Sequence, residues 1–349
     1  MNQPDFFDIQ TYNYDLPQEL IAQKPVSPRD SCRLMVIDRK SGHIDHKHFF
    51  DVLSFFKPGD VLVRNDTRVM AARLEGIKEG GSARCEILLL RPRDAAEKEW
   101  EALVRPGRKL PEGAKVCLDG GVTVSVGAVL SSDGVRSVHF PQDCDVRALE
   151  ESSGSMPLPP YIHERSSSPE DYQTVYSKEA RSAAAPTAGL HFTKELLDKV
   201  SDCGVEIADI TLEVGIGTFR PVKTTDIRQH VMHSERCVIP QSAYDKISAA
   251  KSRGSRVVAL GTTVVRTLEG MAATPGGLRP GSLETELFIY PGFKYQVVDS
   301  LITNFHLPQS TLLMLVAAFA GYDLTMKAYK EAVNRRYRFF SFGDAMMIL

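Results

Sequence analysis

The sequence lacks the motifs by which several large enzyme classes are recognised. It contains no Walker A sequence, no G-x-S-x-G, no H-E-x-x-H, and no G-x-G-x-x-G that follows a strand-like segment. Each of these motifs places a nucleophile, a metal ligand or a phosphate-binding loop at a fixed point of a known fold. Their absence counts against P-loop nucleotide hydrolases, α/β-hydrolases, zincins, nucleotide-dependent dehydrogenases and ordinary Rossmann methyltransferases.

Paired cysteines and long apolar runs are missing as well. The six cysteines are scattered without a C-x-x-C pair, which is typical of free thiols in a reducing compartment. The N-terminal MNQPDFFDIQ has neither a basic nor an apolar segment, so no secretory signal is expected. The longest apolar run, 312–320, is far shorter than the ~20 residues of a membrane span. We therefore expect a cytoplasmic protein with no membrane partner.

Neither sign of charge is in marked excess. With 42 Lys and Arg against 44 Asp and Glu, the net charge is −2, so the whole molecule does not attract polyanions over long range. A nucleic-acid partner would need a local basic face. The length of 349 residues exceeds the roughly 250–300 at which a single core stops growing, which favours two domains.

The pattern of apolar residues predicts where these domains lie. Between Gly59 and about Ser155, short apolar segments such as VLVRN (61–65) alternate with turns, which is typical of a small closed antiparallel barrel. The flanking segments carry two early strands around Lys40–Gly42 and later a strand–helix alternation. The predicted fold class is α/β, with a larger mixed α/β domain (1–60 and 156–349) and an inserted small antiparallel β-barrel domain (61–155).

Within the larger domain the expected helices and strands follow from periodicity and capping signals. The expected helices cover 194–200, 243–254, 263–273, 310–321 and 325–337. The expected strands cover 205–215, 256–260, ETELFIY (284–290) and DSLITNF (299–305).

Three strand-to-helix loops bring polar side chains to helix N-termini. They are PTAGLHFT (186–193), LGTTVVRTLE (260–269) and TNFHLPQST (303–311). Helix N-termini offer free N–H groups, and ligands of open α/β sheets gather outside the carboxyl ends of the strands. We expect the three loops to line one cleft. The structural alternative is that the G-T-T turn only caps a helix and that His191 and His306 are packed, hydrogen-bonded histidines.

HVMHSE (230–235) forms a fourth constellation, with His230, His233 and Glu235. Two histidines three residues apart with a carboxylate can bind zinc or iron. No remote third ligand set suggests itself, so we expect a polar loop that touches substrate or backbone, and no metal.

Basic residues gather in three places: RNDTRVMAAR (64–73), VRPGRKL (104–110) and VNRRYRFFSF (333–342). Each cluster has the chemistry to pair with phosphate, although a charged surface is more often simply solvated.

Together these segments resemble the S-adenosylmethionine:tRNA ribosyltransferase-isomerases of queuosine biosynthesis. The matching motifs run in family order: YDLPQELIAQKP, RNDTRVMAARL, MPLPPYI, DYQTVY, AAPTAGLHFT, EVGIGTFRPV, HSE, GTTVVRTLE, TNFHLPQSTLLMLVAAFAG and FGDAMMI. Two positions depart from the family pattern. Phe342 stands where Tyr is usual, and Arg181 stands where Gly is more frequent.

The resemblance implies an activity, a fold and partners. The ribosyl part of S-adenosylmethionine is transferred to 7-aminomethyl-7-deazaguanine at the tRNA wobble position and isomerised, which gives epoxyqueuosine and releases adenine and methionine. The implied fold is a larger α/β domain that carries a small β-barrel. No cofactor is expected beyond S-adenosylmethionine as co-substrate, because the sulfonium acidifies the adjacent C5′ hydrogens and a base can start the reaction. The expected protein is a monomer whose partners are this co-substrate and the tRNA.

Residue roles follow as hypotheses from this chemistry. Histidine suits proton transfer near neutral pH, and Arg can hold a carboxylate through a bidentate pair. The candidate catalytic residues are His191 and His306, with His233 and Glu235 as secondary ones. The candidate substrate-binding residues are Thr187, Gly189, Phe192, Phe219, Thr262, Thr263, Arg266, Asn304 and Phe305. The candidate tRNA-binding residues are Arg64, Arg68, Arg105 and Arg108. Two rival functions remain: a metal-dependent hydrolase and a non-catalytic RNA-binding protein.

Overall fold

The computed structural model describes residues 4–131, 134–159, 161–163, 168–215, 222 and 224–349. The chain divides into two compact units. The α/β unit comprises 1–67, 160–179 and 185–349, and the barrel unit comprises 68–159 and 180–184.

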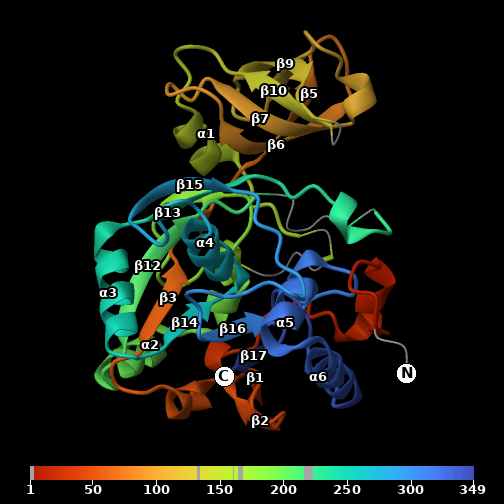
Figure 1. Cartoon of the computed structure of the whole chain (residues 1–349). Helices are drawn as coiled ribbons and strands as arrows, with labels where there is room; N and C mark the ends of the chain where they lie inside the picture. Colours follow the sequence, from red (N-terminus) through yellow and green to blue (C-terminus); the bar gives the residue numbers. More distant parts are fainter. Residues whose placement is uncertain (1–3, 132–133, 160, 164–167, 216–221, 223) are drawn as a thin grey trace. The chain divides into compact units, whose positions relative to one another are not determined.

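A nine-stranded sheet forms the centre of the α/β unit, in the order β15-β13-β12-β3-β14-β16-β17-β1-β2 (Figure 1). The neighbours β12, β3, β14 and β16 run parallel, so their carboxyl ends meet at one edge. The strands are β1 (Arg33–Ile37), β2 (Ile44–His48), β3 (Val61–Asn65), β12 (Glu206–Leu212), β13 (Glu235–Ile239), β14 (Val257–Leu260), β15 (Gly281–Thr285), β16 (Ser300–Asn304) and β17 (Ala345–Ile348).

The two faces of this sheet are covered by different elements. Alternate residues of β3 divide between two cores: Val61 and Val63 pack with α3, α4 and α5, while Leu62 packs with α2 and two 3-10 helices. These helices are α2 (Lys194–Asp202), α3 (Gln241–Ser252), α4 (Thr262–Ala272), α5 (Thr311–Ala320), α6 (Tyr322–Asn334), η4 (Phe49–Phe55) and η7 (Thr187–His191). The predicted caps are confirmed, because Thr193 and Ser310 accept hydrogen bonds from Leu196 and Leu313.

The barrel unit is a closed sheet of six antiparallel strands in the order β10-β7-β6-β5-β8-β9. Buried and more exposed residues alternate along β6 and β7, and the buried ones lie in the core that contains the fully buried Trp100. The strands are β5 (Arg73–Lys78), β6 (Arg84–Pro92), β7 (Glu99–Arg105), β8 (Lys115–Leu118), β9 (Thr123–Val129) and β10 (Val135–His139). A helix α1 (Val146–Ser153) and the short pair β4 (Arg68–Val69) and β11 (Ala180–Ser182) complete the unit.

The predicted fold class is confirmed, and two element predictions are wrong. VLVRN does not belong to the barrel: as β3 it lies between β12 and β14 in the large sheet. Its first three residues are all buried because both faces of a parallel strand are covered, whereas a barrel strand alternates. ETELFIY is not one strand, since β15 ends at Thr285.

In the described part of the chain, no single helix is long and apolar enough to cross a membrane. The bent pair α5 and α6, with 117° between its helices, meets that test by length and composition alone.

Candidate functional site

His191 is the centre of a hydrogen-bonded group at the carboxyl edge of the large sheet. It ends η7, the short helix within PTAGLHFT, and is 4% exposed. Its Nε2 lies 2.9 Å from Asn304 Nδ2 at the end of β16, and its Nδ1 lies 3.2 Å from Cys32 Sγ just before β1. Three segments that are distant in the sequence therefore fix one imidazole.

The Asn304 amide determines which tautomer of His191 is present. Its Nδ2 also donates to the Phe340 carbonyl at 3.1 Å, and its Oδ1 accepts from Thr187 Oγ1 at 3.1 Å. Because only the NH2 group can face a carbonyl oxygen, Nδ2 donates to His191 Nε2, which must then carry a lone pair. The proton is on Nδ1 and points to the Cys32 sulfur.

Burial and nearby cations keep this imidazole neutral. The pKa of His191 falls to about 3, first because the ring is desolvated and then because of the charges of Arg338 and Arg29. Burial also raises the pKa of the Cys32 thiol. At neutral pH His191 is therefore in its base form.

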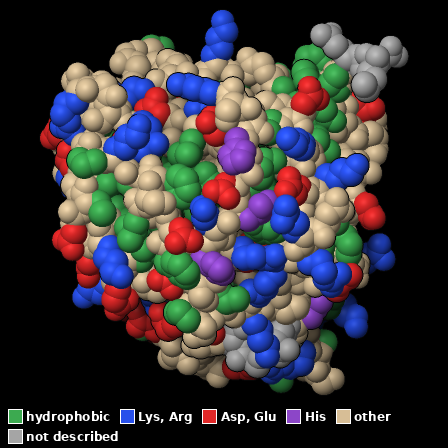
Figure 2. All heavy atoms as spheres, turned by 90° about the horizontal axis from the view of Figure 1, so that it is seen from below, with side chains coloured by type: hydrophobic (Ala, Val, Ile, Leu, Met, Phe, Trp, Pro, Cys, Tyr) green, Lys and Arg blue, Asp and Glu red, His purple; other side chains and the backbone are tan. Residues whose placement is uncertain are grey.

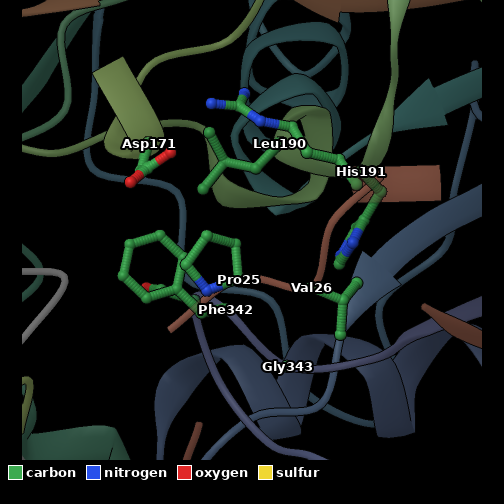
Figure 3. Close-up of a pocket in the computed structure, with 9 residues that line it drawn as sticks. Pro25, Val26, Asp171, Leu190, His191, Phe342 and Gly343 are labelled. Carbon is green, nitrogen blue, oxygen red and sulfur yellow. The ribbon is translucent and has the colours of Figure 1, made fainter. Parts of the chain in front are cut away.

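A small recess in the α/β unit opens onto His191. Figure 3 shows Asp171 and His191 on opposite sides of this recess. Its lining consists of Pro25, Val26, Arg29, Asp171, Leu190, His191, Ser341, Phe342 and Gly343. Phe342, the departure from the family pattern, is buried and packs edge-on against Tyr172, with 5.8 Å between ring centroids.

The three predicted loops do come together. Thr187 and Asn304 join the first loop to the third through their side chains. Gly261, at the N-terminus of α4 in the second loop, has a φ of +94°, and a Cβ added there would lie 3.5 Å from Ala188 Cβ. Thr262 and Thr263 open α4, and Thr263 Oγ1 is buried without a hydrogen-bond partner in the described part of the chain.

Gly189 is required by close packing. A Cβ added at this position would lie 2.0 Å from the Tyr176 hydroxyl oxygen. The chain of η7 therefore rests directly on the Tyr176 side chain, which Arg64 covers at 4.2 Å from the ring centroid. The absence of a side chain at Gly189 lets the backbone before His191 pack directly against Tyr176.

His306 lies in a different setting. The ring Nε2 is 3.1 Å from Thr303 Oγ1. The backbone N–H of His306 donates to the Tyr329 hydroxyl, and its backbone carbonyl accepts from the Tyr14 hydroxyl. Burial alone lowers the pKa of His306 to about 3. It does not belong to the lining of the His191 recess.

Glu235 and Arg266 form a buried ion pair. Arg266 Nη1 contacts Glu235 Oε2, and Glu235 Oε1 accepts from the Gly215 N–H at 3.1 Å. Both side chains are less than a tenth exposed, so the pair holds Gly215 close to Arg266 of α4. Because both carboxylate oxygens of Glu235 have protein partners, its contacts are those of a structural residue.

The neighbouring histidines do not assemble a metal site in the part of the chain that the structure describes. His230 packs edge-on against Phe288 and His233 is exposed. Burial and the adjacent His233 lower the pKa of His230. Among the described residues, no group of three His, Cys, Asp or Glu side chains could hold a metal ion.

The aromatic candidates for stacking are core residues. Phe192 is fully buried and packs edge-on against Phe49, with 4.9 Å between centroids. Phe305 is enclosed by Tyr329, Tyr337 and Phe339. Their expected stacking on a ligand is thus replaced by packing within the protein. Phe219 lies outside the described residues.

The four candidate tRNA-binding arginines are divided between the two units. Arg64, in the α/β unit, is bound to Asp209 at 2.6 Å and is only 14% exposed, so its charge is already paired. Arg68, Arg105 and Arg108 belong to the barrel unit. Of these, Arg105 and Arg108 are exposed; the Arg105 side chain is 74% exposed and lies 4.0 Å from Glu86.

The α/β unit carries a further basic face. Figure 2 shows Lys and Arg side chains gathered with several histidines on the face seen from below, where Figure 1 places β1, β2 and α6. Exposed Lys47 and Arg335 come from β2 and from the end of α6.

Sequence reasoning missed several residues of the recess. Cys32 and Arg29 lie in an unremarkable segment 159 or more positions before His191, and nothing in their pattern indicates the contact. Asp171 lies within DYQTVY, a matching motif, so that motif was the available signal.

Comparison with known proteins decides the family. A model of the family described as "Queuosine biosynthesis protein" matches residues 9–348. The chain belongs to this family. S-adenosylmethionine:tRNA ribosyltransferase-isomerases from Symbiobacterium thermophilum and Moorella thermoacetica are 54% and 51% identical to it, over 97% and 98% of this chain and 98% and 99% of theirs.

A solved member of the family has the same extent. The crystal structure of an S-adenosylmethionine tRNA ribosyltransferase from Thermotoga maritima is 41% identical, covers 99% of this chain and 100% of its own, and has a TM-score of 0.57. The resemblance of the motifs to the ribosyltransferase-isomerases is confirmed.

Proposed function

We propose that this protein is an S-adenosylmethionine-dependent tRNA ribosyltransferase-isomerase that forms epoxyqueuosine from 7-aminomethyl-7-deazaguanine in tRNA, with release of adenine and methionine. The observation that carries the proposal is the match, at 54% identity and nearly full length, to a relative of that name. The meeting of the three loops around His191 gives this activity a site.

The neutral protonation state of His191 bears on whether it can act as a proton acceptor or as a proton donor in the reaction. At neutral pH the ring is neutral, but its Nε2 lone pair accepts from Asn304 and its pKa of about 3 makes it a weak base. His191 therefore takes a substrate proton only if the ligand displaces the Asn304 contact and raises that pKa. We assign His191 the role of base or of a group that holds the base in place. His306 and His233 stay weaker candidates, and Glu235 with Arg266 shapes the site through the ion pair.

The remaining assignments extend this proposal. Thr187, Gly189 and Asn304 build the wall around His191, and Thr262 and Thr263 offer hydroxyl and N–H groups to S-adenosylmethionine at the start of α4. S-adenosylmethionine is the co-substrate, no further cofactor is required, and the enzyme acts as a cytoplasmic monomer. The tRNA phosphates contact Arg68, Arg105 and Arg108.

The deciding experiment incubates the purified protein with S-adenosylmethionine and tRNA that bears 7-aminomethyl-7-deazaguanine. We expect adenine and methionine to appear in equal amounts and only when both substrates are present, as measured by chromatography. Binding of tRNA without release of either product would instead support the non-catalytic RNA-binding alternative. Activity that depends on an added divalent metal would support the hydrolase alternative.

The tRNA surface has its own test. Replacing both Arg105 and Arg108 by Gln is expected to weaken tRNA binding and to lower the salt dependence of log Kd by about one for each phosphate that is no longer bound. The matched control is Arg91→Gln, which removes an exposed barrel arginine that is paired with Glu101. Unchanged affinity and slope in the double variant would remove these residues from the proposed interface.

A further inference from the structure

Two guanidinium groups beside the His191 recess have no carboxylate partner among the described residues. Arg29 donates only to the carbonyls of Gln173 and Glu170, each at 2.7 Å. Arg338 donates through Nη2 to the carbonyl of Lys24. A carbonyl oxygen satisfies an N–H group without neutralising the charge. Other arginines of this region, such as Arg33 with Asp344, do have acidic partners.

Arg338 is also incompletely bonded. Its Nη1 is buried and has no hydrogen-bond partner among the residues that the structure describes. Leaving a buried N–H group of a charged side chain without an acceptor costs free energy, so such groups in a native protein call for an explanation. An acceptor that arrives with a ligand supplies one.

The position of Arg338 connects it to the recess. The carbonyl that it binds belongs to Lys24, directly before the lining residues Pro25 and Val26. Its own backbone presses against Gly343, another lining residue, since a Cβ added at Gly343 would lie 2.5 Å from the Arg338 carbonyl oxygen. Arg338 therefore contacts residues at or next to two parts of the recess lining, Pro25–Val26 and Gly343.

The charges act on the recess itself. Both arginines contribute to the lowered pKa of His191, which shows that their positive fields reach the ring. Asp171 is the acidic group of the lining, and its Oδ2 accepts from the Ser168 N–H at 2.8 Å. Asp344, next to the lining, also accepts from the Arg338 backbone N–H and pairs with the Arg33 side chain. Among the described residues, neither Asp171 nor Asp344 forms an ion pair with the guanidinium of Arg29 or Arg338, so both guanidinium groups keep the ability to bind an oxyanion.

The recess is partly open and offers about 10 Å³ of space to a group of the size of a water molecule, so a single ligand oxygen fits beside the protein. We propose that Arg29 and Arg338 form an oxyanion-binding subsite at the His191 recess that receives an oxygen of a carboxylate or phosphate group. This proposal rests on the proposed function, under which the anion is the methionine carboxylate of S-adenosylmethionine or a phosphate of the tRNA.

The test compares binding to Arg338→Gln, Arg29→Gln and the control Arg336→Gln. Arg336 is 69% exposed and lies 3.8 Å from Glu19, so its replacement removes an equal charge from the same segment outside the recess. If the carboxylate is the ligand, calorimetry should give about tenfold weaker binding of S-adenosylmethionine by each recess variant, with decarboxylated S-adenosylmethionine unaffected. If the phosphate is the ligand, tRNA binding should weaken instead, with a smaller salt dependence.

Both recess variants binding S-adenosylmethionine and tRNA within twofold of the wild type would overturn the subsite. Because Arg29 also holds two carbonyls, a second measurement uses the wild-type protein. Phenylglyoxal modification of Arg29 and Arg338, followed by mass spectrometry, should slow at least fivefold when the subsite is occupied by either ligand, while modification of Arg336 should not; equal rates at Arg29 and Arg338 with and without ligands count against the proposal. These readouts report binding, so a wild-type protein that binds both ligands and releases no adenine would refute the proposed function alone.

Discussion

Two buried histidines in this protein share a low pKa and differ in everything around them. His191 and His306 both titrate at about 3. His191 has a polar partner at each ring nitrogen, lines a recess, and has its pKa lowered in part by the charges of two arginines. The His306 ring contacts the Thr303 hydroxyl, and its backbone N–H and carbonyl bind two tyrosine hydroxyls. Burial alone therefore does not distinguish a site histidine from a packed one. The second property, access to a space that a ligand can enter, separates them.

The sharpest way to break this comparison is to remove each imidazole in turn. His191→Ala should lower the rate of adenine release by about 10²–10⁴-fold, the usual contribution of a positioned proton-transfer group. His306→Ala should leave the rate per folded molecule within a few-fold, because its ring is not part of the lining of the His191 recess. Rates are normalised to the folded fraction from circular dichroism. Equal losses in the two variants would contradict the distinction.

The wall behind His191 should be nearly as sensitive. Gly189→Ala places a methyl group 2.0 Å from the Tyr176 hydroxyl, so η7 or Tyr176 must move. We expect a loss of about 1–3 kcal/mol of unfolding free energy together with a large loss of activity.

Tyr176→Phe is the matched partner for this substitution. In the double variant, the missing hydroxyl should restore part of the unfolding free energy, as measured by urea titration. No difference between the single and double variants would show that the clash is relieved elsewhere.

Acid should expose the shared property of the two histidines. Because the folded pKa of about 3 lies below the unfolded value of 6.5, only the unfolded state gains a proton as the pH falls between them, and stability is lost. From pH 7 to pH 5 each histidine should contribute a loss of about 2 kcal/mol. His306→Gln should reduce the acid-induced loss by that amount, as measured by urea unfolding at both pH values. An identical pH dependence in the variant would place the folded pKa of His306 near 6.5.

The smallest expected effect concerns the contact between the His306 ring and the Thr303 hydroxyl. Thr303→Val removes the hydroxyl that lies 3.1 Å from Nε2 and should cost about 1 kcal/mol of unfolding free energy. Adenine release should stay unchanged, in contrast to Asn304→Ala, which removes the partner of His191 one residue further on. A loss of activity in Thr303→Val would bring His306 back into the site.

Local signals predicted much of the fold. The Ser310 and Thr193 caps, the β1–β2 pair and the helices after β14 and β16 follow from short stretches of sequence whose chemistry is self-contained. The place of VLVRN did not, because a short apolar run is compatible both with a barrel and with a central parallel strand. Only its pairing with β12 and β14, about 145 and 196 residues away, decides between them.

The site was predictable only in part for the same reason. The loops could be found because they carry polar residues at helix starts, and the sheet topology brings those starts together. The contacts of Cys32, Arg29 and Arg338 with this region depend on tertiary packing that leaves no local pattern. A phenylalanine that stacks on a ligand and one that packs in the core look the same in a sequence. Only the burial of the Phe192 ring in the structure shows that it is a core residue.

The place of β17 in the sheet affects the order in which the sheet can form during synthesis. β17 lies between β16 and β1, and it is synthesised after every other strand of this sheet. Until its residues leave the ribosome, the β1–β2 pair has no neighbour through which to join the sheet, and the preceding Ser341–Gly343 wall of the recess does not exist. The nine-stranded sheet and this wall of the recess are therefore completed only after β17 has been synthesised.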